Sequence, residues 1–267
     1  MHFLSTTVIL IKKQIWASLF AILLLTMMLI TFHWNPDPIQ IIFHGKTIYL
    51  YRYDLLFLFA IGIQGLLLLF KLETGKEALV ILIFHIIGTI MELFKTSYNI
   101  QSWQYPENSF FKIGNVPLFT GFMYSAIGSY IARSWRTLDF RFSNYPTIWM
   151  TWILGLSIYI NFFSHHFIYD FRWILLALFL LMYYRSFLYF TIVSKQYCMP
   201  LILALLLVAV GIWIAENIST YLKVWEYPYQ RQQWKMVSPQ KIVAWLLLMS
   251  ISFILISLIN KPKPATT

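Results

Sequence analysis

Eight apolar runs, each long enough to cross a lipid bilayer, dominate this chain of 267 residues. A transmembrane helix needs about 20 apolar residues, with a range of about 17–25. The eight runs are 15–33, 53–70, 78–94, 117–135, 147–164, 171–193, 199–219 and 241–259. Backbone groups in lipid must be satisfied within the segment, and we find no two-residue alternation, so we expect helices. The sequence therefore predicts an all-α, polytopic transmembrane helical bundle of about eight spans, forming one membrane domain over residues 1–267.

The composition agrees with a membrane protein and argues against nucleic-acid binding. Charged residues make up 11% of the chain, whereas a soluble domain has about 25%. The net charge of +10 is scattered over short loops without a long basic tract. We therefore expect membrane lipids as partners and no nucleic acid. The single cysteine, Cys198, excludes an intramolecular disulfide and a cysteine-rich metal site.

A Trp-x-Tyr-Pro motif occurs twice at an offset of 122 residues, and a proline follows each tryptophan after 14 residues. The motif residues are Trp103, Tyr105, Pro106, Trp225, Tyr227 and Pro228. Self-similarity at a fixed period indicates duplication. It predicts two four-helix halves, 1–140 and 141–267, that point the same way in the membrane. Alternatively, the motifs are independent interface anchors, with Trp and Tyr at headgroup depth.

Polar side chains inside the apolar runs are the candidates for a functional core. A charge at bilayer depth costs at least about 2.5–3.5 kcal/mol, so it should face the bundle interior with a partner. The candidates are His85, Glu92, Asn161, Arg185, Glu216 and Asn217. In one hypothesis Glu92 and Glu216 face a central site and share a proton. In the alternative they form structural ion pairs with Lys95, Arg172 or Arg185, and we expect Arg185 to pair from the middle of the sixth run.

Three histidines and an aspartate form a second candidate site. His165 and His166 end the fifth run, Asp170 follows four residues later, and His85 from another run could add a ligand. Such side chains ligate divalent metals. However, adjacent histidines in a helix point about 100° apart and rarely share one ion. A bound divalent metal is therefore one hypothesis. The alternative is no cofactor, with these residues capping the span and contacting headgroups.

Several stretches resemble the YoaT-like family of bacterial integral membrane proteins. They are 52–58, 85–95, 116–124, 128–136, 159–166 and 215–220, and the resemblance covers nearly the whole chain. It implies a protein of the bacterial cytoplasmic membrane with roughly this number of spans. It implies no particular activity.

The basic residues hardly determine the orientation in the membrane. With the N-terminus inside, the inner loops and tails carry 10 Lys and Arg and the outer loops carry 9. The positive-inside rule needs a larger difference. The cluster from Arg133 to Arg141 and the basic ends of the chain favour a cytoplasmic location for both termini.

Three functions follow from these patterns. The first is binding or transport of a small molecule or lipid through a polar intramembrane site. The second is an intramembrane enzyme, metal-dependent or acid/base, acting on a lipid or isoprenoid. The third is a structural or accessory membrane protein whose polar residues only specify packing. The sequence does not decide whether the protein is an enzyme.

Overall fold

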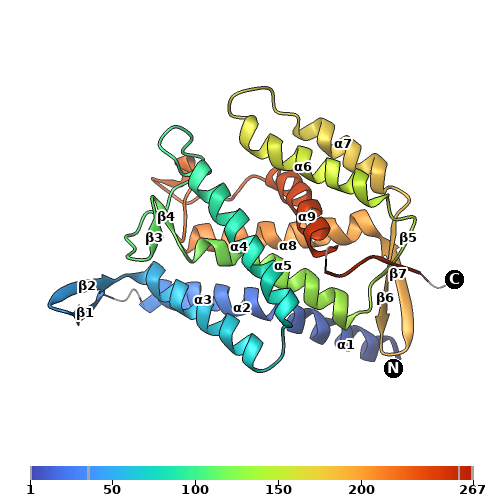
Figure 1. The fold of residues 1–267 in the computed structure, drawn as a ribbon, viewed down its shortest axis with the longest axis horizontal. Helices are drawn as coiled ribbons and strands as arrows, with labels where there is room; N and C mark the ends of the chain where they lie inside the picture. The colour runs from blue at the N-terminus through green and yellow to red at the C-terminus, as the bar shows by residue number, and fades with distance from the viewer. Residues whose placement is uncertain (1, 35–36, 258, 266–267) are drawn as a thin grey trace. The chain divides into compact units, whose positions relative to one another are not determined.

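The computed structural model describes residues 2–34, 37–257 and 259–265, and side chains from Thr6 onward (Figure 1). Contacts between residues divide the chain into two compact units. Unit 1 comprises Met1–Ser18, Gly128–Ile214 and Val237–Thr267, and unit 2 comprises Leu19–Ile127 and Ala215–Met236. Helices α5 (Thr120–Thr137) and α8 (Leu201–Tyr221) contribute residues to both units. The division into halves 1–140 and 141–267 stays a prediction.

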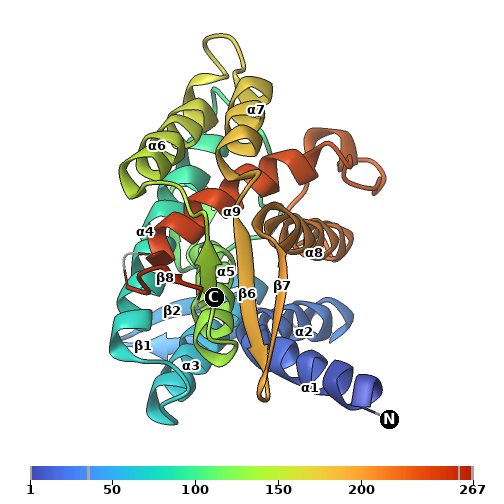
Figure 2. The same cartoon turned by 90° about the vertical axis from the view of Figure 1, so that its right-hand side faces the viewer.

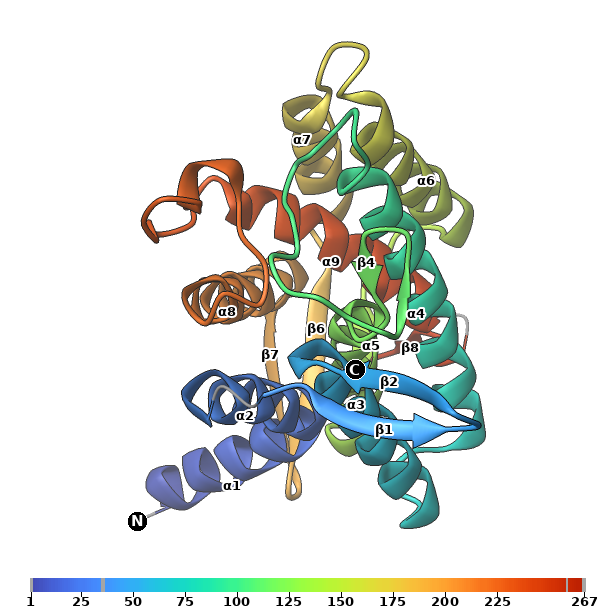
Figure 3. The ribbon, with the colours of Figure 1, turned by 90° about the vertical axis from the view of Figure 1, so that its left-hand side faces the viewer.

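Unit 2 is built mainly from helices, with two small hairpins between them. Its elements are α2 (Leu19–Trp34), β1 (Ile39–Phe43), β2 (Lys46–Leu50), α3 (Arg52–Leu69), α4 (Gly75–Lys95), β3 (Lys112–Ile113), β4 (Val116–Pro117) and the 3₁₀ turn η1 (Pro228–Gln230). Helix α2 packs against α3, and Phe20, Leu56 and Phe119 lie in the shared apolar core. Figure 3 looks onto the end of this unit that carries both hairpins.

Local sequence signals fix where α4 begins and ends. Thr74 caps the helix: its hydroxyl accepts a hydrogen bond from the backbone N–H of Glu77, whose carboxylate accepts one from the N–H of Thr74. This reciprocal capping box satisfies two otherwise unpaired donors. At the other end, the hydroxyl of Thr96 donates to the carbonyl of Glu92. The last turn of α4 therefore holds Glu92 at a defined position.

Unit 1 combines helices with a four-stranded sheet. Its elements are α1 (His2–Ala17), β5 (Arg141–Ser143), α6 (Ile148–Ser164), α7 (Arg172–Tyr183), β6 (Phe187–Ile192), β7 (Lys195–Pro200), α9 (Lys241–Ser257) and β8 (Lys263–Pro264). The strand order is β7-β6-β5-β8, antiparallel except for the parallel pair β5–β8. Helices α6, α7 and α9 pack against one another (Figure 2). Trp135, Phe142 and Phe253 join sheet and helices through ring contacts.

Among the described residues, three helices are long and apolar enough to cross a membrane: α3, α4 and α8. If α1 and α2 together form one span that is bent at Ser18, the number of candidate spans is four. Helices α6, α7 and α9 are apolar but have 10–17 residues. Helices overlap all eight apolar runs, and the count of eight membrane spans stays a prediction.

The structure corrects the expectation of an all-α chain, most clearly in the sixth run, 171–193. Helix α7 ends at Tyr183, and the rest of the run forms β6. In β6 the buried side chains alternate with more exposed ones, which is the two-residue period of a strand, although nearly all of its residues are apolar. Arg185 therefore lies in an exposed turn with its guanidinium 5.1 Å from the ring of Tyr184. The expectation of an arginine in the middle of a span is wrong.

Candidate functional site

The carboxylate of Glu92 lies near the end of α4 and is 2% exposed. Its Oε2 accepts hydrogen bonds from the indole Nε1 of Trp103 at 2.7 Å and from the hydroxyl of Tyr105 at 2.8 Å. Its Oε1 accepts one from the hydroxyl of Tyr124 at 2.8 Å. Hydrogen bonds to a charged acceptor are roughly twice as strong as neutral ones. The loop after α4 and the helix α5 thus both hold this carboxylate.

Two glycines allow α4 and α5 to approach closely beside Glu92. A Cβ atom at Gly88 would lie 2.5 Å from the ring of Tyr124. A Cβ atom at Gly121 would clash with the imidazole ring of His85. Small residues at helix interfaces in lipid permit such approach. Gly88 therefore leaves room for the ring of Tyr124, whose hydroxyl reaches Glu92.

We expect Gly88→Ala to destabilise the protein by about 1–3 kcal/mol, the usual cost of overpacking a core. The added methyl group would displace the ring of Tyr124 and weaken its hydrogen bond to Glu92. Thermal or denaturant unfolding in detergent measures the change. The control is Gly65→Ala in α3, where a Cβ atom meets nothing within 4 Å. There the better helix propensity of alanine should leave stability equal or higher. Equal stabilities for the two variants would contradict the close packing.

Glu216, near the end of α8, has a similar arrangement and is 3% exposed. It accepts a hydrogen bond from the hydroxyl of Tyr227. Burial, and then the charge of Glu216, raise the pKa of Tyr227 well above its ordinary value, so the phenol keeps its proton and donates. Burial and the charge of Glu92 raise the pKa of Tyr105 in the same way.

The aromatic donors of the two carboxylates lie side by side. Tyr124 donates to Glu92, and Tyr227 donates to Glu216. The rings of Trp103 and Tyr227 touch edge to face with their centroids 6.2 Å apart. We name this group the acidic–aromatic cluster: Glu92, Trp103, Tyr105, Tyr124, Glu216 and Tyr227.

The two Trp-x-Tyr-Pro motifs pair with each other through their second residues, Gln104 and Glu226. The backbone N–H of each donates to the carbonyl of the other at 3.0 Å, which forms an isolated antiparallel bridge. The side chain Nε2 of Gln104 donates to Oε1 of Glu226 at 2.6 Å, and Nη2 of Arg231 donates to Oε1 of Gln104 at 2.9 Å. We name these three residues the clasp. The paired residues occupy equivalent motif positions, since 226 − 104 = 122.

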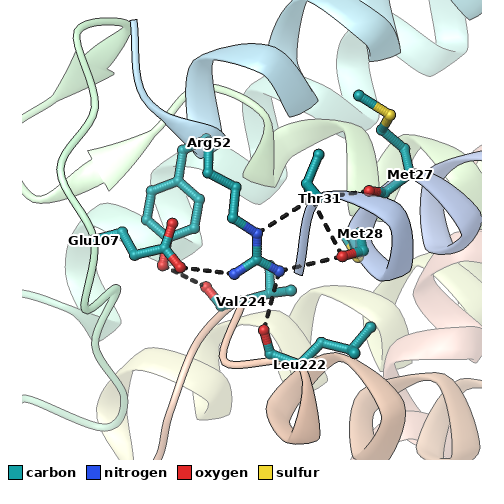
Figure 4. A network of polar contacts seen from close by, with 8 residues as sticks. Met27, Met28, Thr31, Arg52, Glu107, Leu222 and Val224 are labelled. Atoms are coloured by element: carbon teal, nitrogen blue, oxygen red, sulfur yellow. Dashed lines mark hydrogen bonds and ion pairs between the residues drawn. The ribbon is translucent and has the colours of Figure 1, made fainter. Parts of the chain in front are cut away.

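Arg52, the first residue of α3, ties this end of unit 2 together (Figure 4). Its Nε donates to the hydroxyl of Thr31 at 3.2 Å. Its Nη2 donates to the carbonyls of Met28 at 3.3 Å and Leu222 at 3.0 Å. Its Nη1 binds the carboxylate of Glu107 at 2.7 Å. One buried guanidinium therefore connects α2, α3, the segment after α8 and the loop between α4 and α5.

The other polar-core candidates of unit 2 lie beside the cluster. His85 packs its ring on Phe122 at 4.6 Å, and its Nδ1 is buried without a hydrogen-bond partner among the described residues. Asn217 is half-buried, and its carbonyl accepts a hydrogen bond from Thr220. Of the predicted residues of this unit, the structure thus brings the donors of Glu92 and Glu216 together, through the ring contact between Trp103 and Tyr227.

In unit 1, Asn161 organises the turn between α6 and α7. Its side chain donates to Asp170 at 3.2 Å and accepts from the N–H of Phe171, while its carbonyl is 2.8 Å from Nδ1 of His165. Burial alone would raise the pKa of Asp170, but hydrogen bonds from the N–H of Arg172 and from Asn161 lower it below its ordinary value. The guanidinium of Arg172 also lies 3.2 Å from Asp170. This network holds the turn closed.

The metal hypothesis gains no ligand set from the described residues. His85 belongs to unit 2, whereas His165, His166 and Asp170 belong to unit 1. Where side chains are described, no group of three His, Cys, Asp or Glu is arranged to hold a metal ion. A divalent metal and a metal-dependent enzyme stay predictions.

Three of the predicted interface anchors have partners inside unit 2. The polar atoms of Trp103, Tyr105 and Tyr227 bond to the two carboxylates. Trp225 packs against the apolar core of the same unit, and both motif prolines, Pro106 and Pro228, are exposed. The motifs thus contribute donors to the site as well as aromatic surface.

Sequence reasoning missed Tyr124 as a site residue because a tyrosine within an apolar helix gives no signal of its partner. Arg52 was likewise not among the candidates. The available signal was its position: the pattern Arg52-Tyr-Asp54 places two charges at the start of an apolar run, where a buried charge needs hydrogen-bond partners.

Comparisons with known proteins agree with the resemblance seen in the sequence. The family model described as "Protein of unknown function (DUF817)" matches residues 7–253. The chain is 38% identical over 215 residues to "Uncharacterized protein YoaT" of Bacillus subtilis (strain 168), covering 80% of this chain and 81% of that protein. No solved structure matches the chain. The chain belongs to the DUF817 family, together with YoaT-like proteins.

Proposed function

We propose that this protein is a multi-pass carrier of the bacterial cytoplasmic membrane, with both termini in the cytoplasm, that binds a small molecule or lipid at the acidic–aromatic cluster. The three or four helices that are long and apolar enough to cross a membrane support membrane embedding. In this proposal, membrane lipids surround the apolar faces of these helices. The relative from Bacillus supports a bacterial setting.

One observation carries the proposal: two buried carboxylates from different helices lie in one aromatic group, because the donors of Glu92 and Glu216 include Trp103 and Tyr227, whose rings are in contact. Carboxylates at such depth are costly, and functional sites are the usual reason to keep them. Carboxylates accept hydrogen bonds, and tyrosine hydroxyls accept as well as donate. The cluster therefore suits a ligand with a positive charge or several hydrogen-bond donors, which would displace Trp103, Tyr105 or Tyr227 from the carboxylates.

The carrier would consist of two four-helix halves. Supporting this, α4 and α8 both have 21 residues, both carry a glutamate near their end, and both precede a Trp-x-Tyr-Pro motif. Helices α5 and α9, of 18 and 17 residues, follow the motifs. Equivalent motif residues pair with each other. Parallel repeats of this kind place a substrate site where the halves meet.

A ligand screen on purified protein in lipid nanodiscs tests the proposal. Candidates are small amines, polyols and lipid headgroup analogues. A ligand present at about 100 times its dissociation constant stabilises the folded state by about 2.7 kcal/mol, which a thermal melt detects. We expect one class to stabilise the wild type, and this effect to vanish in Glu92→Gln and in Glu216→Gln. Uptake of that class into vesicles containing the protein should show the same pattern.

Asp170→Asn is the matched control, because it also neutralises a hydrogen-bonded carboxylate but lies in unit 1. It should keep the ligand response. If no class stabilises the wild type, or if both glutamine variants respond as the wild type does, the carrier proposal fails.

A purely structural role is the second candidate, and one observation favours it. Both oxygens of Glu92 already accept hydrogen bonds from protein donors. In that case the glutamate anchors the loop after α4, and Glu92→Gln lowers stability without any ligand effect. Thermal melts of Glu92→Gln with and without ligand therefore distinguish the carrier from a purely structural protein.

A further inference from the structure

The paired motifs have a strand-like geometry that links the surface of unit 2 to its buried carboxylates. In an extended segment, neighbouring side chains point to opposite faces. Trp103 and Tyr105 point inward, and both bond to Glu92. Gln104, between them, pairs instead with Glu226. Gln104, which joins the two motifs, is thus the sequence neighbour of both Trp103 and Tyr105, the two residues that donate to Oε2 of Glu92.

The second motif repeats this arrangement. Glu226 pairs with Gln104, and the next residue, Tyr227, bonds to Glu216. The ring of Tyr227 also contacts the ring of Trp103 from the first motif. A movement of either motif therefore disturbs the donors of both carboxylates.

We propose that the clasp is the latch of a gate: when Gln104 and Glu226 separate, the two motifs move apart together and admit ligand to Glu92 and Glu216. This inference rests on the proposed function, because the gate matters only if the carboxylates meet a ligand. Its partner is the same small donor-bearing molecule, which enters when the latch is open.

The clasp is suited to opening because its attachment is small. It is an isolated bridge of one residue pair, whereas β6 and β7 pair over six residues. Gln104 and Glu226 are half-buried, and Arg231 is exposed, so water can replace each of their hydrogen bonds. Elements that move for binding come from such weakly held parts of a structure. By contrast, Glu92 and Glu216, to which the motifs donate, are only 2% and 3% exposed.

A disulfide in place of the bridge tests the gate. The variant is Gln104→Cys with Glu226→Cys, in a Cys198→Ser background that removes the native thiol. Residues in a hydrogen-bonded antiparallel pair have Cα atoms about 5.5 Å apart, within the range that a disulfide spans. We expect oxidation to form the disulfide and abolish the ligand response, and reduction to restore it. Each single cysteine variant is the control and should not change with oxidant. A folded, fully oxidised variant that still responds to ligand would overturn the gate.

Hydrogen exchange tests the latch without any ligand. We expect Gln104→Ala and Arg231→Ala to speed exchange in residues 101–107 and 224–230 together, by about tenfold, because each removes a clasp hydrogen bond. Gln196→Ala, on an exposed position of β7, is the control and should leave both segments unchanged. Faster exchange in one segment alone would show that the motifs do not move as a unit and would refute the proposal. A failed ligand screen with coupled exchange would instead refute the carrier and leave the latch standing.

Discussion

Replacing Arg52 by methionine should remove about 2–4 kcal/mol of stability, because two backbone carbonyls lose a charged donor and each buried group left without a partner costs about 1–3 kcal/mol. The guanidinium is 6% exposed and makes hydrogen bonds to two backbone carbonyls, a threonine hydroxyl and the carboxylate of Glu107. Methionine fills similar volume but satisfies none of these acceptors. The carbonyl of Leu222, just after α8, would lose this donor. Reversible unfolding of the purified protein in mixed micelles measures the difference.

Arg185→Met provides the matched control. Arg185 is exposed in the turn after α7, with its guanidinium over the ring of Tyr184. Exposed cation–π contacts contribute about 0.5–1 kcal/mol, so this variant should stay within that range of the wild type. Arg52→Lys should fall between wild type and Arg52→Met, because an ammonium group lacks the planar fork of five donors. If Arg52→Met and Arg185→Met lose equal stability, Arg52 does not tie the elements of unit 2 together.

Much of the helical framework could be predicted because hydropathy alone locates long helices. The runs beginning at 53, 147 and 241 correspond to α3, α6 and α9, which begin at Arg52, Ile148 and Lys241. The strand β6 was missed because apolar content over a window does not distinguish a buried strand from a helix. The hairpin β6–β7 depends on register between two segments, which a hydropathy count does not contain.

The candidate site was predictable only in part, and the reason is physical. Glu92 and Glu216 stand out because a carboxylate in an apolar run needs an explanation. Their partner Tyr124 does not stand out among the apolar residues of its run. Tyr227 stands out as a motif residue, but tyrosine at a helix end suggests a headgroup anchor rather than a carboxylate donor. The bridge between Gln104 and Glu226 joins residues 122 positions apart. The duplicated motif shows that Gln104 and Glu226 occupy equivalent positions, but it does not show that the two residues are in contact.

Asp54 gives the second large effect. Its side chain is completely buried at the first turn of α3. Oδ1 accepts hydrogen bonds from the hydroxyl of Ser109 at 2.7 Å and from the N–H groups of Phe110 at 3.0 Å and Phe111 at 2.8 Å. Oδ2 accepts from the N–H groups of Tyr51 at 2.8 Å and Phe110 at 2.9 Å. One carboxylate therefore fixes both the start of α3 and the loop before β3.

Asp54→Ala should cost about 3–6 kcal/mol, because three backbone N–H groups lose their acceptor and each buried unsatisfied donor costs about 1–3 kcal/mol. Asp54→Asn should cost roughly half as much, since its amide keeps one acceptor oxygen but turns an NH₂ group toward a backbone donor. The measurement is unfolding in micelles, combined with limited proteolysis of the loop 107–111, which should be cut faster in both variants. The control Asp37→Ala changes an exposed aspartate in the connection between α2 and β1 and should shift stability by less than about 0.5 kcal/mol. Slow proteolysis and near-native stability in Asp54→Ala would mean that the loop is held by the clasp and by Arg52 rather than by this carboxylate.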